Sequence, residues 1–149
     1  MPLIAKLKQN CRSNKINIVD APPGTSCSMV ESVSKTDYCI LVTEPTPFGL
    51  HDLKLSVEVL QFLEIPFGVV INKSQMESDI IEDYCLETEI PILLKLPFDR
   101  RLAEAYSRGE SAVKVFPELK NLFVDLYENI LGNLKKRKLK KAKTIDEII

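Results

Sequence analysis

An acidic residue at the end of an apolar run is the first feature of this sequence that could do chemistry. Residues 16–19 read Ile-Asn-Ile-Val, Asp20 follows them, and two prolines and Gly24 come next. The apolar run predicts a buried strand over residues 16–20, and the prolines and the glycine predict an irregular turn after it. An acid at the carboxyl end of a parallel strand faces the crevice in which open α/β sheets bind ligands. The alternative is a strand and a proline turn that bind nothing.

The turn after Asp20 suits the approach of a phosphate group. Gly24 has no Cβ, so the backbone at this position can come close to an anion. In P-loop nucleotide hydrolases, a strand-end acid of this kind forms the Walker B element, which helps to hold Mg²⁺. Asp20 therefore fits a Walker B position.

Polar residues also follow the other strands that the sequence predicts, at residues 38–43, 67–72 and 92–96. Right-handed crossovers place the carboxyl ends of parallel strands along one edge of a sheet, so we expect these residues to gather there with Asp20. They are the stretch from Thr43 to Gly49, the pair Asn72-Lys73, and the triplet Pro97, Phe98 and Asp99.

The pair Asn72-Lys73 is similar to the start of the N-K-x-D element with which GTPases read guanine. The acid of that element should be residue 75, but Gln75 stands there, and its amide does not offer two charged acceptors. Guanine is therefore disfavoured, whereas the Asn72 amide can read adenine through its donor and its acceptor. A polar strand end that binds no ligand is the alternative.

Helical segments alternate with these strands along the chain. A sheet of unbroken apolar strands joined by helices is parallel and covered on both faces. The predicted fold class is therefore α/β, with three layers and a mostly parallel sheet. The predicted helices lie at residues 3–12, 28–34 (a brief helix or turn), 50–64, 75–88, 99–107 and 117–136.

The composition indicates an ordinary globular chain, with 45% hydrophobic and 28% charged residues among 149. No apolar run approaches the roughly 20 residues that span a bilayer, and no signal-peptide core is visible, so a cytoplasmic protein is expected. The four cysteines contain no C-x-x-C spacing, which excludes a zinc knuckle or an iron–sulfur run. We expect reduced thiols, with Cys39 and Cys85 packed in the core.

The basic residues are concentrated near the end of the sequence. Seven of the 20 Lys and Arg residues lie in residues 135–143, which contain no acid. We expect a globular body over residues 1–134 and a basic tail over residues 135–149. Such a run suits nucleic acid or an anionic membrane, but it offers only Leu139 and Ala142 for insertion, and lysines also complement a helix end. A solvated tail is expected, and neither nucleic acid nor membrane binding is indicated.

Four stretches together resemble the MinD/ParA-type P-loop ATPases, in the branch with a ferredoxin domain inserted near the middle of the chain. The stretches are residues 20–27, 41–54, 69–73 and 90–99, and the resemblance covers about residues 3–130. It implies a P-loop NTPase-like fold that binds ATP and Mg²⁺ at a dimer interface and uses hydrolysis as a switch. It also implies a link to redox or iron–sulfur proteins in the full-length family.

The resemblance implies a role for each residue at the predicted edge. Asp20 would be the catalytic acid, which holds Mg²⁺ indirectly or through water. Gly24 would meet the γ-phosphate, and Asn72 would contact adenine. The loop lying against the base and the ribose would consist of Pro97, Phe98 and Asp99.

The sequence also departs from the family pattern. Its five glycines do not form the G-x-x-x-x-G-K-[ST] of a Walker A loop, and it lacks the clustered cysteines of the ferredoxin insert. The chain therefore resembles the carboxyl-terminal half of such an ATPase, and the iron–sulfur clusters of full-length members would not bind here. In the family, the Walker A strand lies between the strands predicted at 16–20 and 38–43. We expect an unfilled slot there, or a sheet that has closed over it.

Two functional hypotheses follow. The first is a portion of an ATPase that does not hydrolyse ATP alone and needs an amino-terminal half or a homologous subunit, with a homodimer and a redox partner as further partners. The alternative is an inactive remnant that acts as a protein-interaction module through Asp52 and the helix at 50–64. A response-regulator or flavodoxin-like domain fits less well, because the first strand offers Asp20 alone.

Overall fold

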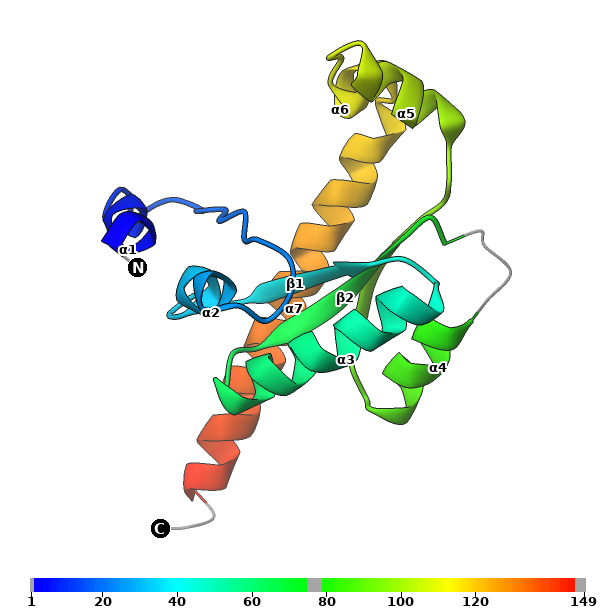
Figure 1. The fold of residues 1–149 in the computed structure, drawn as a ribbon. Coiled ribbons are helices and arrows are strands. Elements are labelled where there is room, and N and C mark those ends of the chain that lie inside the picture. The colour runs from blue at the N-terminus through cyan, green and yellow to red at the C-terminus, as the bar shows by residue number, and fades with distance from the viewer. Residues whose placement is uncertain (1, 75–78, 147–149) are drawn as a thin grey trace.

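Three parallel strands form the centre of the fold (Figure 1). The computed structural model describes residues 2–74 and 79–146. The strands lie in the order β1 (Cys39–Thr43), β2 (Phe67–Asn72) and β3 (Ile92–Leu96). The helices are α1 (Pro2–Lys8), α2 (Cys27–Val33), α3 (Pro47–Phe62), α4 (Ile80–Glu87), α5 (Arg100–Ser107), α6 (Ala112–Val115) and α7 (Glu118–Asp146). The predicted α/β class is confirmed.

Helices cover both faces of this sheet. In Figure 1, α3 and α4 lie in front of the strands and α7 passes behind them. The front layer buries Val69 and Ile71 of β2 completely, against side chains of α3 and α4. Behind the sheet, the Asn129 side chain of α7 donates a hydrogen bond to the Leu93 carbonyl of β3 at 3.2 Å. Because β2 is buried on both faces, its sequence is an almost unbroken apolar run.

The predicted strand at residues 16–20 is wrong. These residues form an irregular segment, in which Ile16 is 68% exposed and Ile18 is 92% exposed. A strand is stable only when a neighbour takes up its backbone hydrogen bonds, and no described residue does so here. The apolar pattern is present, but the neighbour that would turn it into a strand is not among the described residues.

The other predicted strands are confirmed, and the helix boundaries differ more. The helix predicted at 3–12 ends at Lys8, and α6 was not expected. Of the helix predicted at 75–88, α4 is present, whereas residues 75–78 lie outside the described residues. The helix predicted at 117–136 is longer than expected, because α7 continues to Asp146. None of the helices within the described ranges is both long enough and apolar enough to cross a bilayer.

All four cysteines are free thiols, and their environments predict different reactivities. Burial, with a smaller contribution from Glu82, raises the pKa of Cys85 to about 11, whereas Cys11 and Cys27 are exposed. The thiolate is the nucleophile, so at pH 8 only roughly one Cys85 in a thousand would be reactive even if reagent could reach it. We expect iodoacetamide to modify Cys11 and Cys27 in the native chain and Cys85 only after unfolding, as mass spectrometry of peptides would show. Equal labelling of all three would contradict the described core.

Candidate functional site

The carboxyl edge of the sheet brings three loops into contact. The carboxylate of Glu44, after β1, lies 2.8 Å from the ammonium of Lys73, after β2. The backbone N–H of Ser74 donates to the carbonyl of Leu96, at the end of β3, at 2.9 Å. Asn72 is also the register partner of Leu96. The topology therefore gathers Asn72 and the loop after β3, as the sequence predicted.

The loop after β1 is a tight turn into α3. Thr46 caps the helix, its hydroxyl accepting the Gly49 N–H at 2.9 Å, and the Thr43 hydroxyl donates to the Gly49 carbonyl at 3.0 Å. Pro47 at the first helical turn has no N–H to satisfy, which favours a helix start here. A Cβ on Gly49 would lie 2.3 Å from the Glu44 carbonyl oxygen, so only glycine fits.

The pair Glu44–Lys73 was not predicted from the sequence. Lys73 has a φ of +56°, a left-handed turn that follows β2 directly. Both side chains are about two-fifths exposed, at 40% and 42%. An ion pair of this exposure contributes at most about 1 kcal/mol. The only sequence signal for this ion pair is that each residue follows a predicted strand, since 29 positions separate Glu44 from Lys73.

The loop after β3 contains an exposed aromatic ring, that of Phe98, and a carboxylate, that of Asp99, which already accepts hydrogen bonds within the chain. Phe98 is 54% exposed beside Pro97, which is also exposed. The Asp99 carboxylate caps α5 by accepting the Arg101 N–H at 2.9 Å, and it also contacts the Arg101 guanidinium. These hydrogen bonds hold the pKa of Asp99 below its usual value. Asp99 thus has a structural role, while the nucleotide contact assigned to it stays a prediction.

Asp20 and Gly24 lie on the irregular segment between α1 and α2, and both are exposed. The next residue after Asp20, Ala21, packs against a buried cluster of Met29, Val33, Leu60 and Ile65. Gly24 has a φ of +81°, and a Cβ there would touch nothing within 4 Å. The segment that contains these two residues forms no strand of the sheet, and their assignment as a magnesium and phosphate site stays a prediction. Among the described residues, no three His, Cys, Asp or Glu side chains could hold a metal ion.

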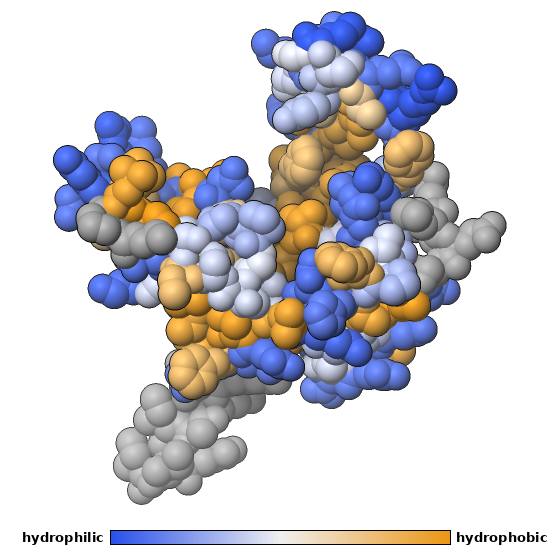
Figure 2. Space-filling model, viewed as in Figure 1, coloured by the Kyte–Doolittle hydropathy of each residue, from blue (hydrophilic) through white to orange (hydrophobic). Residues whose placement is uncertain are grey.

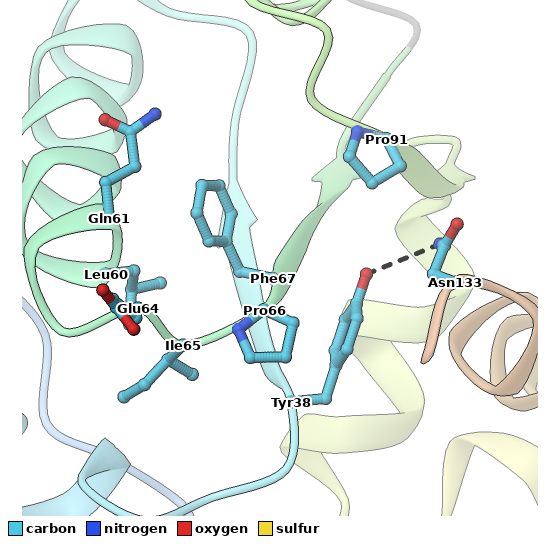
Figure 3. Close-up of a pocket in the computed structure, with 9 residues that line it drawn as sticks. All are labelled: Tyr38, Leu60, Gln61, Glu64, Ile65, Pro66, Phe67, Pro91 and Asn133. Carbon is cyan, nitrogen blue, oxygen red and sulfur yellow. Dashed lines mark hydrogen bonds between the residues drawn. The ribbon is translucent and has the colours of Figure 1, made fainter. Parts of the chain in front are cut away.

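A hollow of about 570 Å³ opens at the opposite, amino-terminal end of the sheet (Figure 3). Figure 3 shows the Tyr38 ring pointing toward Asn133 of α7, whose amide donates to the phenol oxygen at 3.5 Å. Burial raises the pKa of Tyr38, so its phenol stays protonated. This contact could not be predicted from the sequence, because its partners lie 95 residues apart. The lining residues are Tyr38, Leu60, Gln61, Glu64, Ile65, Pro66, Phe67, Pro91 and Asn133.

Solved structures place this arrangement among known folds. The chain superposes on the MinD cell division protein of Aquifex aeolicus with a TM-score of 0.61 and 21% identity, over 75% of this chain and 51% of that one. The cell division ATPase MinD of Pyrococcus furiosus matches with a TM-score of 0.61 and 28% identity, over 76% and 50%. The chain has a MinD-type fold. No family model matches the sequence.

Several curated proteins are similar to this chain in sequence. The uncharacterized protein MJ0579 of Methanocaldococcus jannaschii is 37% identical over 120 residues, which are 80% of this chain and 40% of that protein. MJ0578 of the same organism is 26% identical over 134 residues, covering 86% and 46%. A cytosolic Fe-S cluster assembly factor, the Nubp1 homolog of Drosophila pseudoobscura pseudoobscura, is 29% identical over 140 residues, covering 78% and 44%.

The chain therefore spans less than half the length of the curated relatives that it matches. Together with the MinD-type fold, the comparisons identify a P-loop ATPase-related domain.

Proposed function

We propose that residues 1–134 are the carboxyl-terminal part of a MinD-type ATPase domain, and that residues 135–149 are a basic extension of it. This part would hold the base end of ATP and act as a nucleotide-dependent switch in the cytoplasm once the rest of the domain is in place. The observation that carries the proposal is the placement of Asn72 and Phe98 at one sheet edge. Asn72 ends β2 beside Leu96, Phe98 follows β3, and the Ser74 N–H donates to the Leu96 carbonyl.

The residues present suit the base of the nucleotide. The Asn72 amide has both a donor and an acceptor, which matches the edge of adenine. Phe98 has an exposed ring on the neighbouring loop, and aromatic rings stack on bases.

The residues present do not suit the phosphates. Gly24 lies on the irregular segment before α2, the Lys73 ammonium is paired with Glu44, and these 149 residues contain no Walker A sequence. Phosphoryl transfer depends on positioning and charge stabilisation, both of which need a phosphate cradle. We therefore propose that this chain alone does not hydrolyse ATP, and we derive no catalytic step from it.

The proposal assigns the missing parts to a partner. An amino-terminal half, in a longer polypeptide or in a second subunit, would supply the phosphate cradle. Asp20 and Gly24 would then reach the carboxyl edge and meet Mg²⁺ and the γ-phosphate. The name of the Nubp1 homolog supports a link of the whole protein to iron–sulfur assembly, with homodimers and redox partners as further proposals.

We expect weak nucleotide binding by the chain alone, with a dissociation constant of about 1 mM, because only the base finds partners. AMP and ATP should bind about equally, and amide signals near Asn72 and residues 97–99 should shift in a two-dimensional NMR titration. Asn72→Ala should weaken binding about fivefold through loss of its hydrogen bonds, whereas Asn121→Ala, on the exposed surface of α7, should not change it. Equal binding of GTP, or shifts confined to another surface, would contradict the proposed base site.

The alternative function, a protein-interaction module, is favoured by one observation on α3. Phe48, Leu55 and Phe62 are exposed at 77%, 39% and 87%, and their seven-residue spacing places them along one side of the helix. Figure 2 shows apolar residues among charged ones on the face formed by α3 and α4. Asp52 lies on the same helix and is exposed. Exposed apolar patches of this kind often contact other proteins.

A further inference from the structure

The Arg101 side chain of α5 links two loops that lie apart in the sequence. Its Nε donates to Oδ1 of Asp99 at 3.0 Å, and its Nη2 donates to Oδ2 of the same carboxylate at 2.5 Å. The same guanidinium lies over the ring of Phe116, with its central carbon 5.0 Å from the ring centre. Asp99 belongs to the loop after β3 and Phe116 to the short link between α6 and α7, so one side chain connects these two loops.

The Phe116 ring is a fixed platform for the guanidinium. Phe116 is only 8% exposed and is packed in a buried cluster with Ala105 of α5 and Leu119 of α7. Leu96, the last residue of β3, packs against the same cluster. Figure 1 shows α5 and α6 together at the start of α7. Because a closely packed ring has little freedom to move, the contact restrains Arg101 rather than Phe116.

Arginine suits both of these contacts. A guanidinium is planar, its fork of donors matches a carboxylate, and it stacks on aromatic faces, whereas a lysine ammonium is a compact point charge. The Asp99 carboxylate also caps α5 by accepting the backbone N–H of Arg101 at 2.9 Å. Asp99 is therefore held by the backbone and by the side chain of one residue.

These contacts restrain the residue that precedes Asp99. Phe98 lies between Asp99, which Arg101 holds, and Pro97, whose own ring fixes its φ at about −65°. A loop residue between two restrained neighbours has few backbone conformations, so the direction of the exposed Phe98 ring depends on the position of Asp99. A ring that is already held in place loses less conformational entropy when a ligand binds to it.

We propose that Arg101 is a positioning residue for the nucleobase, because it holds Asp99 and thereby keeps the Phe98 ring in the orientation that stacks on the base. The inference deepens the proposed function and rests on it. Arg101 acts through Phe98 rather than by a contact of its own with the nucleotide. Since every base has a face on which a ring can stack, Arg101 would raise the affinity for nucleotides in general, whereas Asn72 would select adenine.

A double-mutant cycle tests whether Arg101 acts through Phe98. AMP binding to the 149-residue chain is measured by two-dimensional NMR titration. Arg101→Lys should weaken binding about threefold, and Phe98→Ala about fivefold. The chain with both substitutions should bind AMP as Phe98→Ala does, because the ring through which Arg101 acts is then absent. Two independent effects would instead multiply to about fifteenfold.

Arg100→Lys is the matched control. Arg100 is the neighbour of Arg101 on α5, and its Nε donates to the Glu104 carboxylate at 3.0 Å. The same substitution at this position breaks a contact within α5 and leaves the pair of Asp99 and Arg101 in place. It should change AMP binding less than about 1.5-fold, because an exposed ion pair contributes little. Circular dichroism checks that every variant is folded.

Nitrogen-15 relaxation of the free chain tests the restraint without any nucleotide. In the parent chain and in Arg100→Lys, the N–H groups of Phe98 and Asp99 should have order parameters of about 0.85, as rigid backbone does. In Arg101→Lys, both order parameters should fall toward about 0.6. A loss of global stability alone would not lower the order parameters of these two residues selectively.

Two results would overturn the inference. One is an order parameter of Phe98 that Arg101→Lys leaves unchanged. The other is a double variant that binds AMP about threefold more weakly than Phe98→Ala alone, because Arg101 would then act by another route. A parent chain that binds no AMP, although Arg101 orders the loop, would contradict the proposed base site and limit the role of Arg101 to the order of the loop.

Discussion

Gly49→Ala is expected to lower the free energy of unfolding by roughly 2–4 kcal/mol, measured by urea denaturation. The new Cβ would lie 2.3 Å from the Glu44 carbonyl oxygen and 2.9 Å from the Thr43 hydroxyl oxygen. The first of these atoms is backbone at the carboxyl end of β1, so it moves only if the turn into α3 moves with it. The Glu44–Lys73 ion pair should loosen as a result, because Glu44 lies in the displaced turn.

Gly132→Ala is the matched control for this substitution. A Cβ there would meet nothing within 4 Å, and Gly132 lies inside the long helix α7. Alanine is a better helix former than glycine by roughly 0.5–1 kcal/mol, so this variant should be slightly more stable than the parent. If the Gly49→Ala variant were as stable as the Gly132→Ala variant, the turn after β1 would have space for a Cβ at residue 49. That result would contradict the described geometry of the turn.

Ile71→Ala is expected to lower the free energy of unfolding by about 3 kcal/mol, whereas Ile40→Ala should cost less than about 1 kcal/mol. Both residues are isoleucines of the same sheet, but Ile71 is 0% exposed and Ile40 is 41% exposed. Truncating Ile71 leaves a cavity between β2 and the helices α3 and α4, while truncating Ile40 removes surface that is already partly in water.

The contrast between the two variants tests the described burial of the sheet. Equal losses of stability in Ile71→Ala and Ile40→Ala would contradict the difference in exposure between these two side chains.

Much of the fold could be predicted because its signals are local. The runs at residues 67–72 and 92–96 are apolar, short and bounded by turn residues, and their predicted bounds equal those of β2 and β3. Their position between helices then makes the sheet parallel without further information. The gathering of Asn72 with residues 97–99 follows from that topology alone, since parallel strands end at one edge.

The rest could not be predicted because it depends on partners distant in the sequence. Residues 16–20 carry as clear a strand pattern as β1 does, but a pattern describes a segment, whereas a strand also needs a neighbour. The hydrogen bonds between the Arg101 guanidinium and the Asp99 carboxylate depend on the conformation of the Arg101 side chain at the start of α5. The spacing of apolar residues gives no information about that conformation. An acid just before a predicted helix often caps that helix, so the position of Asp99 was the sequence signal for its structural role.

The length of α7 has a mechanical consequence. A helix of 29 residues measures about 43 Å, and its part from Asn129, which bonds to β3, to Asp146 accounts for about 26 Å of that length. Residues 135–143, which include seven Lys and Arg residues, therefore belong to a helix that continues from the body of the fold. A partner that binds the far end of α7 would therefore fix the orientation of the sheet. A partner that binds a flexible tail of the same charge would not.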